Sequence, residues 1–137
     1  MSYGMAAALQ AAVYQHLLGD AGVGGLVGAA IFDALPPGDL PQTYVTLGPE
    51  DVRDRSDGSG DGAVHRFTVS VVTQAAGFGA AKAVAAAIGD ALSGADLTLG
   101  RGRLVGLWFE RAAARRGGKA GQVRRIDLQF RARVEDN

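Results

Sequence analysis

The spacing of apolar residues divides the chain into helical and extended segments. In residues 5–18 the larger apolar residues recur at every fourth position, and a second stripe with helical spacing runs through residues 78–92. In residues 64–73 and 125–134 apolar and polar side chains alternate instead, which is the period of a half-buried strand. The pattern therefore predicts two helices and two well-defined strands.

The remaining apolar segments are shorter and less regular. Val23, Leu26 and Val27 are spaced for about one helical turn. Residues 103–111 are apolar at consecutive positions, which predicts a strand covered on both faces, with Trp108 and Phe109 in the core. Further short strands are predicted at residues 31–32, 42–48 and 97–100.

Taken in order, these elements predict an α+β fold. The expected order is helix, three strands, helix and three strands, in a single domain that covers residues 1–137. Consecutive strands joined by short turns pair in antiparallel fashion, so the sheet should be mainly antiparallel, with the two helices packed on one of its faces.

Two predicted connections carry much of the charge. The segment 50–62 is acidic, rich in glycine and without periodicity, so it is predicted to be a long mobile loop between two strands. The segment 111–125 is rich in arginine and is predicted to form a hairpin around a glycine-rich turn at residues 112–122. The candidate contact residues of these two segments are Glu50, Asp51, Asp54, Asp57, Asp61, Arg111, Arg115, Arg116, Lys119, Arg124 and Arg125.

Three interpretations of the basic hairpin fit the sequence. It is a solvated hairpin, a docking surface for a carboxylate-rich protein, or a surface for nucleic-acid phosphates. Side chains that could stack on bases are missing from the segment, because the nearby Trp108 and Phe109 are expected in the core. The charges are unevenly placed: residues 33–61 hold seven acids and two arginines, whereas residues 101–133 hold ten basic residues and two acids. The fold should therefore present an acidic and a basic region.

The overall composition excludes several classes of function. The 14 basic and 14 acidic residues give a net charge of zero, so no global field attracts nucleic acid or an anionic membrane. Cysteine is absent, which excludes disulfides, thiolate zinc ligands and a cysteine nucleophile. The first basic residue is Arg53, and polar residues interrupt the N-terminal apolar stretch, so neither a signal peptide nor a membrane span is predicted. We expect a soluble protein with no membrane partner.

Both predicted helices lack the charged outer face of an ordinary surface helix. No charged residue lies between Met1 and Gly19, and only Lys82 and Asp90 lie in the second helix. Either a neighbouring subunit covers these uncharged faces, or the alanine enrichment of a GC-rich genome has diluted the charges.

The segment that begins at Asp57 resembles the start of a helix-loop-helix calcium site. Asp57, Ser59, Asp61 and Gly62 match the opening positions, but position twelve, which must supply a bidentate carboxylate, is Thr68. The following residues also alternate as a strand rather than a helix. No specific metal site is therefore predicted, and weak calcium binding by the loop stays open.

The sequence contains no recognisable catalytic or cofactor-binding pattern. His16 and His65 have no acid or nucleophile at a spacing that connects to them. The glycines of residues 22–28 lack the lysine and hydroxyl of a phosphate-binding loop. We therefore predict a protein that is not an enzyme and needs no cofactor. A small enzyme whose site is assembled from distant residues stays open as a third interpretation.

In their order along the chain, the segments resemble the tail terminator, or tail-completion, proteins of long-tailed bacteriophages and of phage-derived gene transfer agents. The resemblance begins with a Val-Gly-x-x-Ile-Phe-Asp segment at residues 27–33 and a Pro-x-x-Tyr-Val strand at residues 41–45. A polar loop, the strand HRFTVSVVT, an alanine-rich helix and the arginine-rich hairpin then follow. The resemblance covers nearly the whole chain.

What the resemblance implies is a structural role without catalysis. Such proteins form a ring, typically a hexamer, that caps the finished tail tube, ends its growth and joins the tail to the head side. The implied partners are further copies of the chain, the tail tube protein and a head-side connector or stopper protein. DNA passes through the ring without specific recognition.

The resemblance also implies where the protein is found and which segments make contacts. Assembly would take place in the bacterial cytoplasm, and the protein would be part of the tail of a virion or gene transfer agent particle. The loop 50–62 and the hairpin 111–125 are then the candidate docking elements. The main alternative is a small nucleic-acid-binding module that uses the arginine-rich hairpin.

Overall fold

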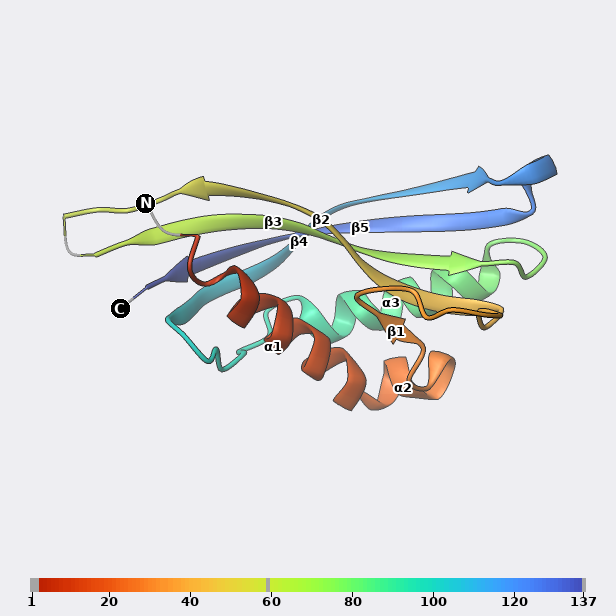
Figure 1. Ribbon diagram of the computed structural model, residues 1–137, viewed down its shortest axis with the longest axis horizontal. Helices are drawn as coiled ribbons and strands as arrows, with labels where there is room; N and C mark the ends of the chain where they lie inside the picture. Colours follow the sequence, from red (N-terminus) through yellow and green to blue (C-terminus); the bar gives the residue numbers. More distant parts are fainter. Residues whose placement is uncertain (1–2, 59, 137) are drawn as a thin grey trace.

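The molecule has two layers, a sheet and a set of helices (Figure 1). The computed structural model describes residues 3–58 and 60–136, and within them it has a five-stranded sheet and three helices. The helices are α1 (Ala6–Gly19), α2 (Ala21–Val27) and α3 (Gly79–Leu92). The strands are β1 (Ile31–Phe32), β2 (Thr43–Asp54), β3 (Gly62–Thr73), β4 (Arg103–Gly117) and β5 (Val123–Glu135), with a short 3-10 turn, η1 (Lys119–Gly121), before β5.

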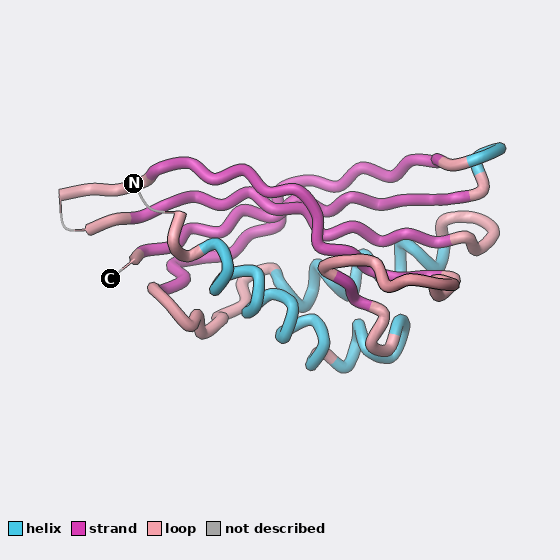
Figure 2. Tube along the Cα trace, viewed as in Figure 1, coloured by secondary structure: helices cyan, strands magenta, loops and turns pink. Residues whose placement is uncertain are grey.

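The sheet has the strand order β1-β2-β3-β5-β4. The short β1 runs parallel to β2, and every other neighbouring pair is antiparallel. The helices α1, α2 and α3 all lie on one face of the sheet, and η1 lies at the tip of the β4–β5 hairpin (Figure 2). The predicted α+β class and the mainly antiparallel sheet are confirmed.

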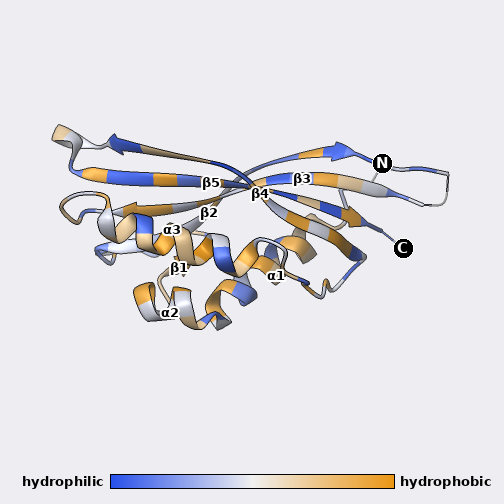
Figure 3. Ribbon diagram, turned by 180° about the vertical axis from the view of Figure 1, so that it is seen from behind, coloured by the Kyte–Doolittle hydropathy of each residue, from blue (hydrophilic) through white to orange (hydrophobic). Residues whose placement is uncertain are grey.

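The core lies between the sheet and the helices. Because side chains alternate along a strand, β3 and β5 each send every second residue towards the helices, and Figure 3 shows this alternation of hydropathy along β5. From the helices, Leu9, Val13 and Leu17 of α1 and Val84, Ile88 and Leu92 of α3 are buried against that face. The two helices predicted from apolar spacing are therefore confirmed.

Two parts of the predicted element order are wrong. Residues 21–27 form a complete helix rather than a single turn, because the side chain of Asp20 caps it by accepting a hydrogen bond from Val23 N at 2.9 Å. Residues 97–100 form no strand. Gly94 and Gly102 turn the chain with φ angles of +76° and +71°, so the segment crosses from α3 to β4 instead of pairing with a strand.

The two charged segments are more regular than predicted. β2 continues to Asp54 and pairs with β3 as far as Ala63, so only residues 55–61 connect the two strands. β4 continues to Gly117, which reduces the predicted turn to residues 118–122. Pairing with a neighbouring strand satisfies the backbone groups of these polar residues while their side chains stay in solvent, and sequence periodicity does not record that pairing.

The prediction that strand 103–111 is covered on both faces is also wrong. β4 is the edge strand, and Trp108 and Phe109 are 41% and 46% exposed. Its register with β5 shifts between Leu104 and Gly106 and again between Phe109 and Arg111. Each bulge adds one residue to β4, which breaks the alternation and makes the strand appear continuously apolar.

Candidate docking surfaces

Two hairpins reach the opposite ends of the sheet (Figure 1). The β2–β3 hairpin ends in residues 55–61, close to the end of the molecule where both termini lie. The β4–β5 hairpin ends in residues 118–122 at the other end. Asp57 and Asp61 therefore lie at one end of the sheet and Arg115, Arg116, Arg124 and Arg125 towards the other, whereas Glu50 and Arg111 lie near its middle, opposite Phe67 and Gln129.

Three of the predicted basic residues already have partners within the chain. Arg115 Nη2 lies 3.2 Å from Asp127 Oδ2, and Arg125 Nε donates to Asp127 Oδ1 at 2.8 Å. Arg124 Nη1 donates to the carbonyl oxygen of Ala75 at 3.1 Å, with its guanidinium above the ring of Phe78. Arg115 and Arg125 hold the hairpin together through Asp127, and Arg124 anchors the part next to the turn to the segment that leads into α3.

Arg111 and Arg116 differ from these three. Both are exposed, and neither forms an ion pair within residues 3–58 and 60–136. The backbone of Lys119 lies in η1, but its side chain is outside the described part of the structure. Arg111 and Arg116 are therefore the predicted basic residues that the fold leaves available for an external carboxylate or phosphate.

Asp127 is the acid around which the basic hairpin is organised. Burial by itself raises the pKa of Asp127, but hydrogen bonds from Ser70 and Arg125 and the charges of Arg125 and Arg115 outweigh it. The net result is a pKa below the ordinary value for an aspartate. Asp127 thus stays ionised at neutral pH and neutralises part of the arginine cluster.

Among the predicted acidic residues, Glu50 is already engaged within the chain, with the buried His65 and with Tyr3. Its Oε2 lies 3.0 Å from Nδ1 of the fully buried His65, and its Oε1 accepts a hydrogen bond from the Tyr3 hydroxyl at 2.9 Å. A register shift between Leu47 and Glu50 turns Glu50 to the helix face of the sheet. The expectation that no acid could be connected with His65 is therefore wrong, because a bulge and strand pairing bring the two together.

The other predicted acids lie along the outer part of the β2–β3 hairpin. Asp51 is paired with Arg53 at 3.6 Å, and both side chains are mostly exposed. Asp54 accepts a hydrogen bond from the Ser56 hydroxyl at 2.7 Å, which lowers the pKa of its carboxyl group. Asp57 and Asp61 lie in the connection itself.

The calcium-like pattern at this connection is not completed by the fold. Within residues 3–58 and 60–136 there is no group of three or more His, Asp and Glu side chains that could hold a metal ion. Ser59, the third residue of the pattern, lies outside the described residues. Strand β3 already begins at Gly62, so no helix follows the loop as a calcium site of this type requires.

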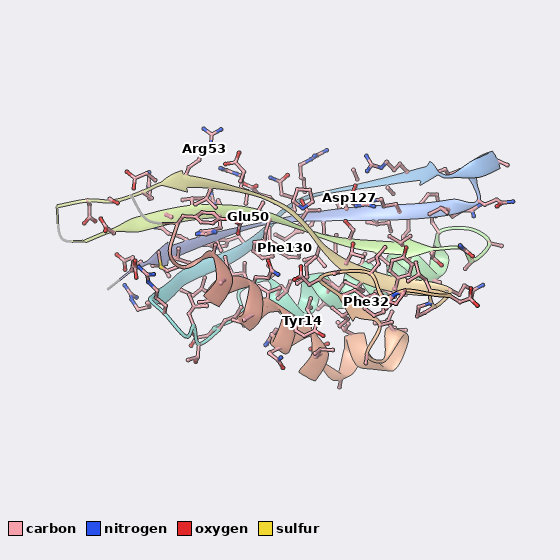
Figure 4. All side chains as sticks on the ribbon, viewed as in Figure 1. Tyr14, Phe32, Glu50, Arg53, Asp127 and Phe130 are labelled. Atoms are coloured by element: carbon pink, nitrogen blue, oxygen red, sulfur yellow. The ribbon has the colours of Figure 1, made fainter. Side chains whose placement is uncertain are left out.

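The face of the sheet away from the helices carries an arginine-lined cleft that was not predicted from the sequence. Figure 4 shows Arg53 on that side of the sheet and Phe130 between the sheet and the helices. The guanidinium of Arg131 lies 4.8 Å from the centre of the Trp108 ring, and Arg66 Nε donates to Glu110 at 3.1 Å. The cleft has a volume of about 370 Å³ and is lined by Arg53, Asp54, Arg55, Val64, Arg66, Trp108, Arg131 and Arg133. The alternating arginines of β5 were the available signal for it.

A second surface, on the helix side, is apolar. A groove of about 520 Å³ lies between α3 and the edge strand β4. Its walls combine small residues of α3 with apolar residues of the two last strands, among them the exposed Phe109. The groove does not follow from the sequence pattern, which predicts Phe109 in the core.

Comparison with known proteins identifies the family. The family model described as "Tail completion protein gp17" matches residues 11–135. The chain belongs to this family. It is also 66% identical to a chain in the solved structure "Virion of native gene transfer agent (GTA) particle", with a TM-score of 0.93. The match covers 98% of this chain and 99% of that chain.

Family membership confirms the resemblance seen in the sequence and supports a structural tail protein. A comparison with curated proteins gives no match. Within the described residues, no helix is long and apolar enough to cross a membrane.

Proposed function

We propose that the protein forms a ring, with six copies as its family implies, that caps the tail tube and joins the tail to the head-side connector. The ring ends tube growth, and DNA passes through it without specific recognition. Its role is structural rather than catalytic. The observation that carries this proposal is the extensive similarity to a chain of a gene transfer agent virion, at 66% identity over 98% of the sequence.

The geometry supports a joint between two different partners. One hairpin ends in an acidic tip and the other is rich in arginine, and they lie at opposite ends of one sheet. Charge complementarity selects partners and fixes their register, so opposite charges at opposite ends favour two different docking surfaces. One end would meet the tail tube and the other the head-side connector.

Reversing the charge of Arg111 and Arg116 tests the docking role of the basic hairpin. These two residues are suitable because Arg115, Arg124 and Arg125 have partners inside the chain. The double variant Arg111→Glu, Arg116→Glu should fold normally but leave tails unattached to heads in electron micrographs. The matched control, Arg111→Lys with Arg116→Lys, keeps both charges and should join normally. Normal joining by the glutamate variant would overturn the docking role.

The nucleic-acid-binding alternative keeps one specific observation in its favour. Trp108 is exposed beside Arg131 and the other arginines of the outer cleft, which is a combination that can hold a base and its phosphates. It predicts that the isolated protein binds single-stranded DNA with an affinity that falls steeply with salt. The proposed ring does not require such binding. If the isolated protein does not bind single-stranded DNA, the nucleic-acid-binding alternative is wrong and the proposed ring is unaffected.

A further inference from the structure

The apolar groove has the composition of a surface that is covered in the working protein. Its floor comes from β4 and β5 and its wall from α3, and one side is open because β4 has no neighbouring strand. Phe109 contributes a large exposed ring. The small side chains of α3 and β4 leave room for the backbone of a second molecule to come close to the Phe109 ring. The apolar lining residues are Ala85, Ala86, Gly89, Phe109, Ala112, Ala114, Ile126 and Leu128.

An exposed apolar segment lies at the opposite edge of the sheet. Residues 33–42 connect β1 to β2, and all ten are exposed, including Leu35 at 51% and Leu40 at 36%. The segment has no helix or strand and contains three prolines. Proline restricts the backbone before binding, so such a segment loses little conformational entropy when it docks into an apolar groove.

The groove and the segment cannot meet within one chain. The segment adjoins β1 and β2, the groove is floored by β4 and β5, and β3 lies between these two pairs of strands. A head-to-tail contact between two copies covers both surfaces at once, and repeating that contact around a closing rotation generates a ring. A two-fold contact could cover both surfaces only if each copy presented its segment and its groove to the same partner, whereas the two lie at opposite edges of the sheet.

We propose that residues 33–42 of one copy lie in the groove between α3 and β4 of the next copy, with Leu35 and Leu40 as the apolar anchors. This inference rests on the proposed ring and names the surface that closes it. Charge gives the contact a direction. Asp33 and Asp39 form no ion pair within the described residues, and the segment has no basic residue. The groove has Lys82 near one end and Asp90 near the other, so the acids of the segment favour the Lys82 end.

The absence of cysteine from the chain allows a direct cross-linking test. Leu35→Cys and Ala86→Cys are combined in one chain and treated with a short bismaleimide in assembled particles. The double variant should give a ladder of linked chains on a denaturing gel, because each copy is joined to the next. Each single variant should give no ladder. Assembled particles in which the double variant gives no more cross-linking than the single variants would overturn the inference.

A pair of blocking variants tests the head-to-tail direction. Leu35→Glu with Leu40→Glu blocks the segment, and Ala86→Glu with Ala112→Glu blocks the groove, all at exposed positions. Neither variant alone should form rings. Their mixture should form dimers and nothing larger, because each mixed pair keeps one intact contact. Native mass spectrometry measures the outcome, and rings formed by either variant alone would contradict the contact.

Matched controls separate this contact from general effects of added charge. Ala83→Glu lies on an exposed position of α3 outside the groove, and Leu26→Glu replaces an exposed leucine outside the segment. Both controls should assemble like the unchanged protein. If the segment-blocked variant still forms rings that cap tubes, the docking inference fails and the proposed function stands. If intact rings form but never cap a tube, the proposed function fails and the contact stands.

Discussion

Phe130 and Phe109 lie opposite each other on neighbouring strands and are exposed to very different extents. Phe130 is fully buried and stacks on Phe67 at 5.7 Å, whereas Phe109 packs edge-on against Phe130 at 5.9 Å and is 46% exposed. Phe130→Ala should lower the free energy of unfolding by about 3–5 kcal/mol, because it leaves a cavity in the core. Phe109→Ala should cost about 1 kcal/mol, mainly the lost aromatic contact. Chemical denaturation measures both, and equal losses would contradict the assigned burial.

Asp127 links stability to pH through its lowered pKa. Its carboxylate accepts hydrogen bonds from Ser70 at 2.6 Å and Arg125 at 2.8 Å, so Asp127→Asn should lower the free energy of unfolding at pH 7 by about 1–2 kcal/mol. The folded pKa lies below the unfolded value of about 4, so the stabilisation is complete above that value. It is lost as the pH falls through the folded pKa.

The stability difference between Asp127→Asn and the unchanged protein should therefore be constant from about pH 5 to 7 and shrink below about pH 4. Denaturation curves recorded across this range test the sign. Asp51→Asn is the control, because its ion pair with Arg53 is 3.6 Å long and both partners are mostly exposed. It should change stability by less than about 0.5 kcal/mol. A difference for Asp127→Asn that grows in acid would contradict the assigned pKa direction.

At the scale of elements, Gly102 fixes the entry of the chain into β4. It has a φ of +71°, and a Cβ atom there would lie 2.6 Å from the carbonyl oxygen of Glu135. Gly102→Ala should therefore cost more than about 2 kcal/mol, since backbone strain of about 1–2 kcal/mol adds to displacement of the last part of β5. Gly77→Ala is the control. Its φ is +78°, but no atom lies within 4 Å of the added Cβ, so only the strain remains. Thermal unfolding of both variants tests the comparison.

Elements with regular spacing were predictable from sequence because their burial follows one period. α1, α3, β3 and β5 each bury every residue of one face, and local patterns record that burial. β4 and the outer half of β2 could not be predicted, because bulges shift their register and their backbone bonds depend on a distant partner strand.

The candidate sites were predictable only as regions of charge. Which charges remain available depends on register, since Asp127 of β5 engages Arg115 across the hairpin and Glu50 turns inward to His65. Neither pairing follows from spacing along the chain. The outer arginine cleft and the apolar groove each combine residues from several elements, so they became visible only once the strand order was known.

At the scale of the whole molecule, variants of the two hairpins should block different steps of particle assembly. Replacing residues 56–61 with Asn-Gly removes the acidic tip, including Asp57 and Asp61, and closes the strands with a favoured two-residue turn. Arg55 N and Gly62 O already form a hydrogen bond of 2.8 Å across that position, so the domain should stay folded.

We expect particles with the shortened acidic tip to accumulate a different intermediate from particles with Arg111→Glu and Arg116→Glu. One variant should lose contact with the tail tube and the other with the head side, because residues 56–61 and Arg116 lie near opposite ends of the sheet. Negative-stain micrographs of tail length and head attachment distinguish the two. The same intermediate in both variants would show that the hairpins do not serve separate partners.

The continuous ladder from β2 through β3 and β5 to β4 also makes the sheet a spacer of fixed length. β3 has 12 residues, so at about 3.3 Å per residue it spans about 40 Å between the two ends. Two residues added to each long strand would lengthen this spacer by about 7 Å and keep every side chain on its face. One residue added to each long strand would turn the apolar side chains beyond the insertion to the outer face of the sheet, and the arginines to the helix face. The distance between the two hairpin tips can therefore change only in steps of two residues if both faces of the sheet are to be kept.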